Sequence, residues 1–185
     1  REFLTQDELK RLEEKQIGIS RLEQVRDIFL FCCLTGLAYV DVASLSTENI
    51  VEGKRGRQWL RKARNKTNNM CNIPLLRPAL RILEKYAEYR AATGRLLPVP
   101  SNQKMNAYLK ELATLCGVAK NLTTHCARHT FATTVTLANG ASLENISKML
   151  GHSSVRMTQH YAKILNSSIE RDMDKIESEL IGEDE

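Results

Sequence analysis

The sequence has 185 residues, of which 42% are apolar, and its formal net charge is +5. Such a chain is long enough to bury a sizeable core, and it contains no apolar run of the length that a membrane span needs. We therefore expect one soluble domain without a membrane partner. The amphipathic pattern of the first ten residues argues against a signal peptide and for a cytoplasmic location.

The charge is divided unevenly along the chain. Residues 170–185 contain 8 acidic and 2 basic side chains, a net charge of −6 that leaves +11 on residues 1–169. A basic body attracts polyanions because neutralising phosphates releases condensed counterions, so nucleic acid is the natural candidate partner. Charge alone nevertheless favours a plainer interpretation, an ordinary basic surface that serves solubility.

The cysteines argue against disulfides and against a zinc site. Their number is odd and they contain no C-x-x-C pair, a pattern typical of reduced, mostly buried thiols. They are Cys32, Cys33, Cys71, Cys116 and Cys126. We expect neither a metal nor another cofactor.

Helix signals dominate the chain from its start. Thr5 and Ser20 are each followed three residues later by a glutamate, which predicts a capping box at the start of two helices. Apolar residues recur at helical spacing over residues 22–32, and Gly36 is placed to end that helix. Further helix starts are expected at Pro78, Ser101, Thr124, Ser142 and Ser154.

Between about residues 50 and 76 the pattern changes to short strands separated by glycine and asparagine turns. We therefore predict a mainly α fold with a small antiparallel β-sheet (α+β). We expect the helices and the sheet to form one domain over residues 1–165, followed by an acidic C-terminal tail over residues 166–185. Composition alone favours a frayed, solvated terminus for this tail.

The most informative residues lie in the last third of the chain. His125 and Arg128 are three apart on a predicted helix, so both can face one anion. Gly151 is placed to end the next helix, which puts His152 in the following loop, and Tyr161 comes nine residues later. Each residue taken alone is more often structural than catalytic.

As an ordered set, His-x-x-Arg, then Gly-His, then His-Tyr resembles the signature of the tyrosine recombinase and integrase family. The segment from Thr35 to Leu45 resembles the family's first motif, and the hairpin ending at Lys66 and Thr67 resembles the segment that carries its catalytic lysine. The resemblance spans nearly the whole chain and implies the catalytic-domain fold of that family.

One position departs from the family pattern. Ala38 stands where the first motif normally has an arginine, which removes one of two guanidinium groups expected on the scissile phosphate. Alternation along a strand would place Arg64 on the same side as Lys66, so we expect Arg64 to replace the missing arginine. Some integrases of conjugative transposons resemble this variant. The alternative for Arg64 is a strand residue that touches the DNA backbone.

The resemblance implies an enzyme, a site-specific DNA recombinase of bacterial origin that integrates or excises a mobile element through a 3′-phosphotyrosyl intermediate. It implies these catalytic residues: Tyr161, Arg128, His125, His152, Lys66 and Arg64. The implied partners are double-stranded DNA and, on DNA, a homo-tetramer in which the tail docks on a neighbouring protomer; no small-molecule substrate is expected.

Several alternatives stay open. Ala38 also fits a catalytically silent relative that only binds DNA, and the same chemistry fits a Xer-like recombinase or an invertase. A type IB topoisomerase usually lacks the histidine found here at His125, and a plain helical interaction protein would need none of these motifs. His160 and His129 are interpreted as structural residues or DNA contacts, and Asp41 as a residue that orients the site, caps a helix or pairs with a cation.

Overall fold

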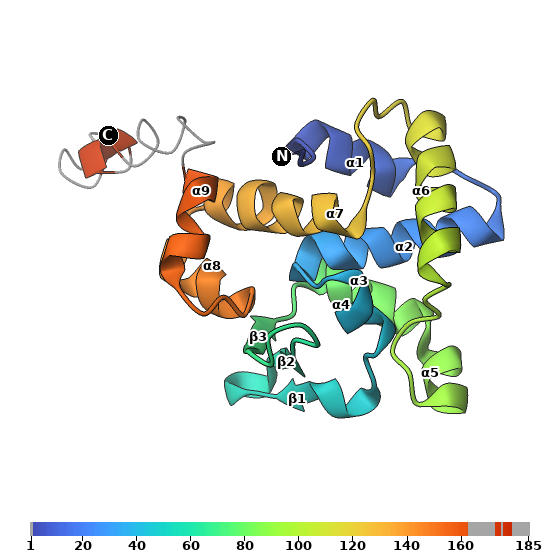
Figure 1. The fold of residues 1–185 in the computed structure, drawn as a ribbon, viewed down its shortest axis with the longest axis horizontal. Helices are drawn as coiled ribbons and strands as arrows, with labels where there is room; N and C mark the ends of the chain where they lie inside the picture. The colour runs from blue at the N-terminus through green and yellow to red at the C-terminus, as the bar shows by residue number, and fades with distance from the viewer. Residues whose placement is uncertain (1, 163–172, 175, 179–185) are drawn as a thin grey trace, which may run out of the picture.

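The computed structural model describes residues 2–162, 173–174 and 176–178. Within these ranges the chain forms mainly helices with one small sheet, which confirms the predicted fold class (Figure 1). No helix among the described residues is both long and apolar enough to span a bilayer. The predicted domain boundary at residue 165 and most of the predicted tail, residues 166–185, lie outside the described residues.

The helices and strands follow one another in the order α1 to α3, β1 to β3 and α4 to α9. The helices are α1 (Gln6–Glu14), α2 (Ser20–Thr35), α3 (Tyr39–Ala43), α4 (Arg77–Lys85), α5 (Ala87–Thr93), α6 (Asn102–Leu115), α7 (Thr124–Thr130), α8 (Leu143–Met149) and α9 (Gln159–Ala162). The strands are β1 (Ile50–Glu52), β2 (Gln58–Ala63) and β3 (Met70–Pro74). Short helical turns are η1 (Thr47–Asn49), η2 (Lys54–Gly56), η3 (Phe131–Thr136), η4 (Leu137–Asn139) and η5 (Val155–Met157).

Helix α2 is the centre of the core. Helices α1, α4, α6 and α7 pack around it, as Figure 1 shows. The apolar residues that predicted this helix are buried, and so are Leu30, Phe31 and Cys33 on its other faces. The part of the helix from Ile28 to Cys33 is buried on every face, so it is apolar all round rather than along one stripe.

Most of the predicted helix ends are confirmed, and one is wrong. The capping box at Thr5 is present. The second one is not, because α2 already begins at Ser20 with Ile19 as its N-cap, and the Glu23 carboxylate instead accepts a hydrogen bond from the Gly18 N–H. Other predicted starts and stops are confirmed at Gly36, Pro78, Ser101 and Ser142.

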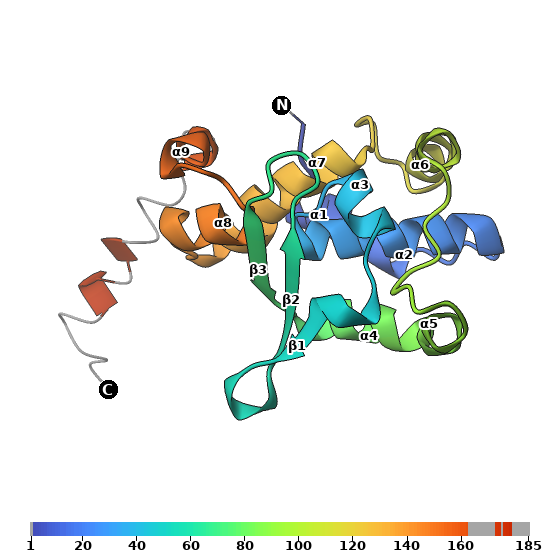
Figure 2. The same cartoon turned by 60° about the horizontal axis from the view of Figure 1, so that its bottom comes forward.

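The sheet has the order β1, β2, β3 with antiparallel neighbours, as the pattern of residues 50–76 predicts. Leu60 on β2 faces Ile73 on β3, and both are buried with Cys71, so one face of the sheet covers the core. The turn between β2 and β3 extends towards α3 and α8 (Figure 2). This turn thereby brings residues 64–69 to the candidate site.

All five cysteines are buried thiols, as the sequence predicts. Burial raises the pKa of Cys32 to about 12 and the pKa of Cys71 to about 11, so both thiols are protonated at neutral pH. They act as small apolar residues of the core.

Candidate active site

Arg128 is the most deeply placed of the predicted site residues. Thr123 caps α7 by accepting a hydrogen bond from the Cys126 N–H, and the helix then directs Arg128 inward, where only 6% of it is exposed. Its Nη1 donates to the Gly36 carbonyl at 2.7 Å and its Nη2 to the Leu150 carbonyl at 2.8 Å. The guanidinium therefore joins the ends of α2 and α8, and since arginine carries five N–H donors, further donors remain for a ligand.

Burial and, after it, the neighbouring positive charge of Arg64 lower the pKa of Arg128 to about 10. The side chain remains protonated at neutral pH. Two guanidinium groups that repel each other in a poorly hydrated place destabilise the site unless an anion neutralises them.

Arg64 lies beside Arg128 and is held by a buried carboxylate. Its Nε is 3.8 Å from Oδ2 of Asp41, which is 1% exposed and whose Oδ1 accepts a hydrogen bond from the Asn65 N–H at 2.9 Å. The Nε atom is buried and makes no hydrogen bond with the described residues. Asp41 therefore orients Arg64 through an ion pair, one of the roles considered for it from the sequence.

The physical reason for expecting Arg64 in the site was wrong. Strand β2 ends at Ala63, so residues 64–67 form a turn, and the alternation of a strand does not relate Arg64 to Lys66. The two side chains differ in burial, since Arg64 is largely covered whereas Lys66 is exposed. The turn, closed by a hydrogen bond from the Asn68 N–H to the Arg64 carbonyl, places Arg64 at the cluster.

His152 follows the end of α8, as predicted. Gly151 has a φ of +61°, which ends the helix, and the His152 N–H donates to the Ser147 carbonyl. The imidazole Nδ1 lies 2.8 Å from the Thr158 hydroxyl. Burial, followed by the positive charges of Arg128 and Arg64, lowers the pKa of His152 to about 4. The ring is therefore neutral at pH 7 and belongs to the same electrostatic cluster.

Tyr161 lies on α9 and is 3% exposed. Its hydroxyl is 2.9 Å from Nδ1 of His129, and its ring lies against the ring of His160 with 3.8 Å between centroids. The charge of an ionised Tyr161 favours the protonated form of Arg128, so the phenol and the guanidinium interact electrostatically. The structure thus gathers Arg64, Arg128 and His152 and places Tyr161 within electrostatic range of them.

His125 and Lys66 lie at the surface. His125 is exposed, and its ring packs edge-on against His129 at 4.3 Å between centroids, while Arg128 on the same helix is buried. Lys66 is exposed in the turn between β2 and β3. Both side chains are therefore accessible from solvent.

His129 is the residue that sequence reasoning passed over. It was interpreted as a structural residue or a DNA contact, yet it is 2% exposed and touches the hydroxyl of Tyr161. One signal could have pointed to it: His125 and His129 are four apart on α7, so they share a helix face. The contact with Tyr161 could not be found in this way because it joins residues 32 positions apart.

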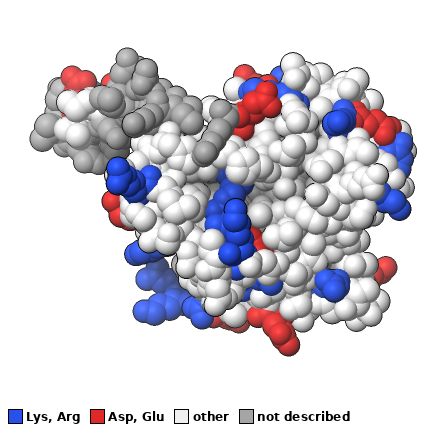
Figure 3. All heavy atoms as spheres, in the orientation of Figure 1, with Lys and Arg blue, Asp and Glu red and all other residues white. Residues whose placement is uncertain are grey.

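Basic side chains gather at the centre of the face seen in Figure 3, between the α8–α9 side and the rest of the molecule. A second basic group lies at the lower left of that view, where Figure 1 places η2. Lys54, Arg55 and Arg57 belong to this second segment. Further lysines and arginines lie around the edge of this face, some of them beside acidic residues (Figure 3).

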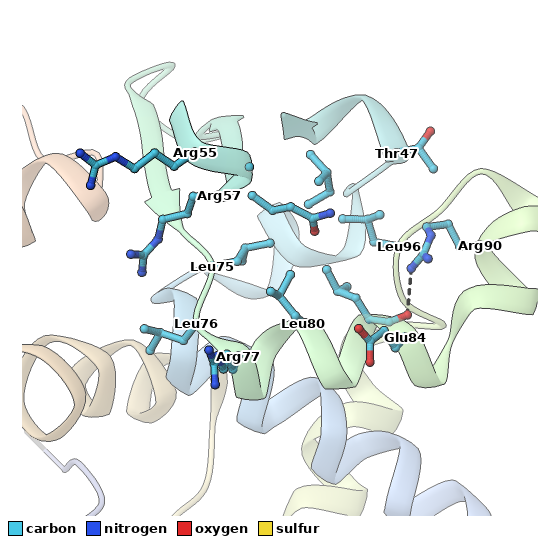
Figure 4. Close-up of a pocket in the computed structure, with 14 residues that line it drawn as sticks. Thr47, Arg55, Arg57, Leu75, Leu76, Arg77, Leu80, Glu84, Arg90 and Leu96 are labelled. Atoms are coloured by element: carbon cyan, nitrogen blue, oxygen red, sulfur yellow. Dashed lines mark hydrogen bonds between the residues drawn. The ribbon is translucent and has the colours of Figure 1, made fainter. Parts of the chain in front are cut away.

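A separate hollow of about 890 Å³ lies between the sheet, η2 and α4 (Figure 4). Leu75 and Leu80 line it together with several arginines, among which Arg90 donates to the Leu83 carbonyl at 2.8 Å. None of the predicted catalytic residues lines this hollow, so it is distinct from the candidate active site.

Residues 2–167 match the sequence profile of the phage integrase family. The chain therefore belongs to this family, which confirms the resemblance inferred from the motifs. It is similar to the tyrosine recombinase XerA of Pyrococcus furiosus, with 30% identity over 183 residues that cover 91% of this chain and 60% of the relative. It is also similar to XerD of Rhizobium meliloti, with 31% identity over 146 residues that cover 73% of this chain and 45% of the relative. The chain thus spans less than two thirds of the length of these relatives.

Solved structures show the same fold. The crystal structure of XerA recombinase matches with a TM-score of 0.69 at 23% identity, over 95% of this chain and 65% of that chain. The catalytic domain of bacteriophage HP1 integrase matches with a TM-score of 0.63 at 20% identity, over 94% of both chains. The fold is therefore that of an integrase catalytic domain.

Proposed function

We propose that this chain is the catalytic domain of a site-specific DNA recombinase that cuts and rejoins DNA strands through a covalent bond between Tyr161 and a 3′-phosphate. The observation that supports it best is the cluster of Arg64, Arg128 and His152, in which burial and then the neighbouring guanidinium charges lower the pKa values of Arg128 and His152, with Tyr161 in electrostatic range of Arg128. Asp41 balances one of the two guanidinium charges, and a DNA phosphate would balance the other.

The proposed reaction begins with in-line attack of the Tyr161 hydroxyl on the phosphorus. Negative charge then builds up on the non-bridging oxygens, and fixed donors stabilise it there. Arg128 and Arg64 supply guanidinium donors, and His125 and His152 supply imidazoles. Lys66, in the accessible turn, donates the proton that the departing 5′-oxygen needs. The free 5′-hydroxyl later attacks the phosphotyrosyl bond of a partner strand, so the bond energy is kept and no cofactor is required.

Arg64 takes the place of the first-motif arginine in this proposal. The support is electrostatic, because the positive charge of Arg64 acts on both Arg128 and His152, as a second guanidinium on the phosphate would. Asp41 holds it at the required place. The catalytically silent alternative, suggested by Ala38, leaves the buried ion pair of Arg64 without a function.

Double-stranded DNA is the proposed partner. Crystal structures of the XerH site-specific recombinase bound to a palindromic difH substrate and of a lambda integrase dimer bound to a core site share this fold. The basic surface supports the same partner for this chain. A homo-tetramer on DNA, integration or excision of a mobile element, and action in a bacterial cytoplasm complete the proposal.

Covalent trapping tests the proposal. The chain is incubated at low salt with nicked suicide DNA substrates that carry the end sequences of its element, and a denaturant-resistant protein–DNA adduct is measured. We expect an adduct with the wild type and none with Tyr161→Phe. Arg64→Ala is expected to lower the rate of adduct formation by about 10²–10³-fold, the usual effect of removing one donor from a developing charge.

Arg61→Ala is the matched control, because Arg61 is an exposed basic residue on the neighbouring strand β2. It is expected to weaken DNA binding slightly and to leave the cleavage rate unchanged. Tight DNA binding by the wild type without any adduct would contradict the proposed activity and favour the binding-only relative. Equal rates for Arg64→Ala and Arg61→Ala would remove Arg64 from the site.

A further inference from the structure

The hydroxyl of Tyr161 lies in direct contact with the imidazole of His129. The distance from Oη to Nδ1 is 2.9 Å, within the normal range of a hydrogen bond, and both residues are almost completely buried, at 3% and 2% exposed. A hydrogen bond shielded from water is stronger than one at the surface. The nucleophile named above is thus already bound to a group that can exchange a proton with it.

The surroundings fix the position of His129. The Thr133 hydroxyl donates to the His129 carbonyl at 2.7 Å, and the neighbouring Thr130 hydroxyl donates to the Cys126 carbonyl while it accepts from the Leu4 N–H at 2.9 Å. The chain then enters the π-helical turn η3, against which α9 packs. Such turns often occur at functional sites. This turn directly follows the helix of His129 and contacts the helix of Tyr161, so it links the two residues.

We propose that His129 accepts the proton of Tyr161 during attack on DNA, an inference that rests on the function proposed above. A phenol has an ordinary pKa of about 10 and an imidazole one of about 6.5, so at neutral pH the phenol is protonated and much of the imidazole is neutral and able to accept. As the Oη–P bond forms and the P–O5′ bond breaks, the Oη proton moves to Nδ1 of His129. The 5′-oxygen takes its proton from Lys66. The reverse transfers occur when the strand is rejoined.

Other titratable groups surround His129 but are placed differently. On α7, the ring of His125 packs against it at 4.3 Å between centroids, and Arg128 points to the carbonyls of Gly36 and Leu150. On α9, the ring of His160 lies 6.3 Å from that of His129 and stacks on the ring of Tyr161 rather than on its hydroxyl edge. On α2, burial raises the pKa of Cys33 well above its ordinary value, so this thiol stays protonated.

The geometry leaves the tyrosine oxygen able to react. A phenolic oxygen donates one hydrogen bond and also accepts, so it keeps a lone pair for phosphorus while its proton is held by Nδ1. The described part of helix α9 is Gln159–Ala162, and it follows the short 3-10 turn η5.

The test compares His129→Asn with Cys126→Ala in the full chain. The asparagine Oδ1 can replace Nδ1 as a hydrogen-bond acceptor but cannot take a proton, whereas Cys126 is a buried neighbour on α7 that serves as a control for damage to the helix. Adduct formation on suicide DNA is measured in a single turnover from pH 5 to pH 9, together with DNA affinity and thermal stability.

For His129→Asn we expect unchanged DNA affinity and a cleavage rate that falls by about 10²–10⁴-fold, the usual contribution of a positioned base. The wild-type rate rises with pH as the imidazole of His129 loses its proton, and the variant lacks this rise. A DNA substrate with sulfur in place of the bridging 5′-oxygen needs no acid, so it restores Lys66→Ala but not His129→Asn. Cys126→Ala cleaves like the wild type.

If His129→Asn does not fold, the pH dependence of cleavage is measured instead in a variant of the exposed His125. The rise of the cleavage rate with pH persists in His125→Asn if His129 is the base, and its disappearance assigns the rise to His125 and overturns the inference. A wild type without any adduct means that the proposed function itself fails. An active wild type with an equally active His129→Asn means that only the role of His129 fails.

Discussion

Replacing Gly151 by alanine tests how the end of α8 is built against the site. Gly151 has a φ of +61°, in the left-handed region, where a residue with a Cβ loses about 1–2 kcal/mol. The added Cβ would lie 2.9 Å from Sγ of Cys71 and 3.0 Å from Cδ of Arg64, closer than carbon atoms normally approach. Overpacking of this kind costs a further 1–3 kcal/mol or so. We therefore expect Gly151→Ala to lose about 2–5 kcal/mol of unfolding free energy.

Gly94 offers the matched control. It has a similar φ of +72°, it also ends a helix, and an added Cβ there meets nothing within 4 Å. Gly94→Ala should therefore lose only the backbone contribution, about 1–2 kcal/mol. Urea unfolding gives both free energies. Equal losses in the two variants would refute the close packing of Gly151, and the cleavage rate should fall in Gly151→Ala alone because Arg64 is displaced.

Three further outcomes follow from the structure. Leu60→Ala removes a fully buried side chain opposite Ile73 and should lower the unfolding free energy by about 2–5 kcal/mol, measured by urea unfolding; a loss below about 1 kcal/mol would contradict the packing of the sheet. The pKa of His152 is lowered to about 4 in the folded chain, so between pH 6.5 and 4 the unfolded chain binds a proton that the folded chain does not. The unfolding free energy, measured by urea unfolding, should therefore decrease as the pH is lowered through this range, and it should decrease less steeply in His152→Asn. DNA affinity measured between 50 and about 200 mM salt should fall linearly on logarithmic axes, and a flat response would exclude phosphate contacts.

The sequence predicted the features that depend on local patterns. Helix α2 follows from the spacing of its apolar residues and from Gly36, and the sheet follows from the turns on either side of Gln58–Ala63. Ser20 shows the limit of such patterns. A serine three residues before a glutamate suits a cap, yet the packed helix extends over the serine.

The parts of the site that join distant segments could not be predicted in this way. Arg64 was expected at the site from strand alternation, but a turn places it there, held by Asp41 on a different element. The contact of His129 with Tyr161 depends on how α9 packs against the helix that contains η3. The ordered motif predicted which residues belong to the site. Which of them are in contact depends on tertiary packing and could not be predicted from the motif.

The adduct itself gives the most direct test of the central claim. After trapping on suicide DNA, the protein is digested and the peptide that carries the nucleotide is identified by mass spectrometry. The chain contains five tyrosines, Tyr39, Tyr86, Tyr89, Tyr108 and Tyr161. The proposed mechanism predicts that Tyr161 is the modified residue and that it is joined to a 3′-phosphate. An adduct on another tyrosine, or none despite tight DNA binding, would contradict it.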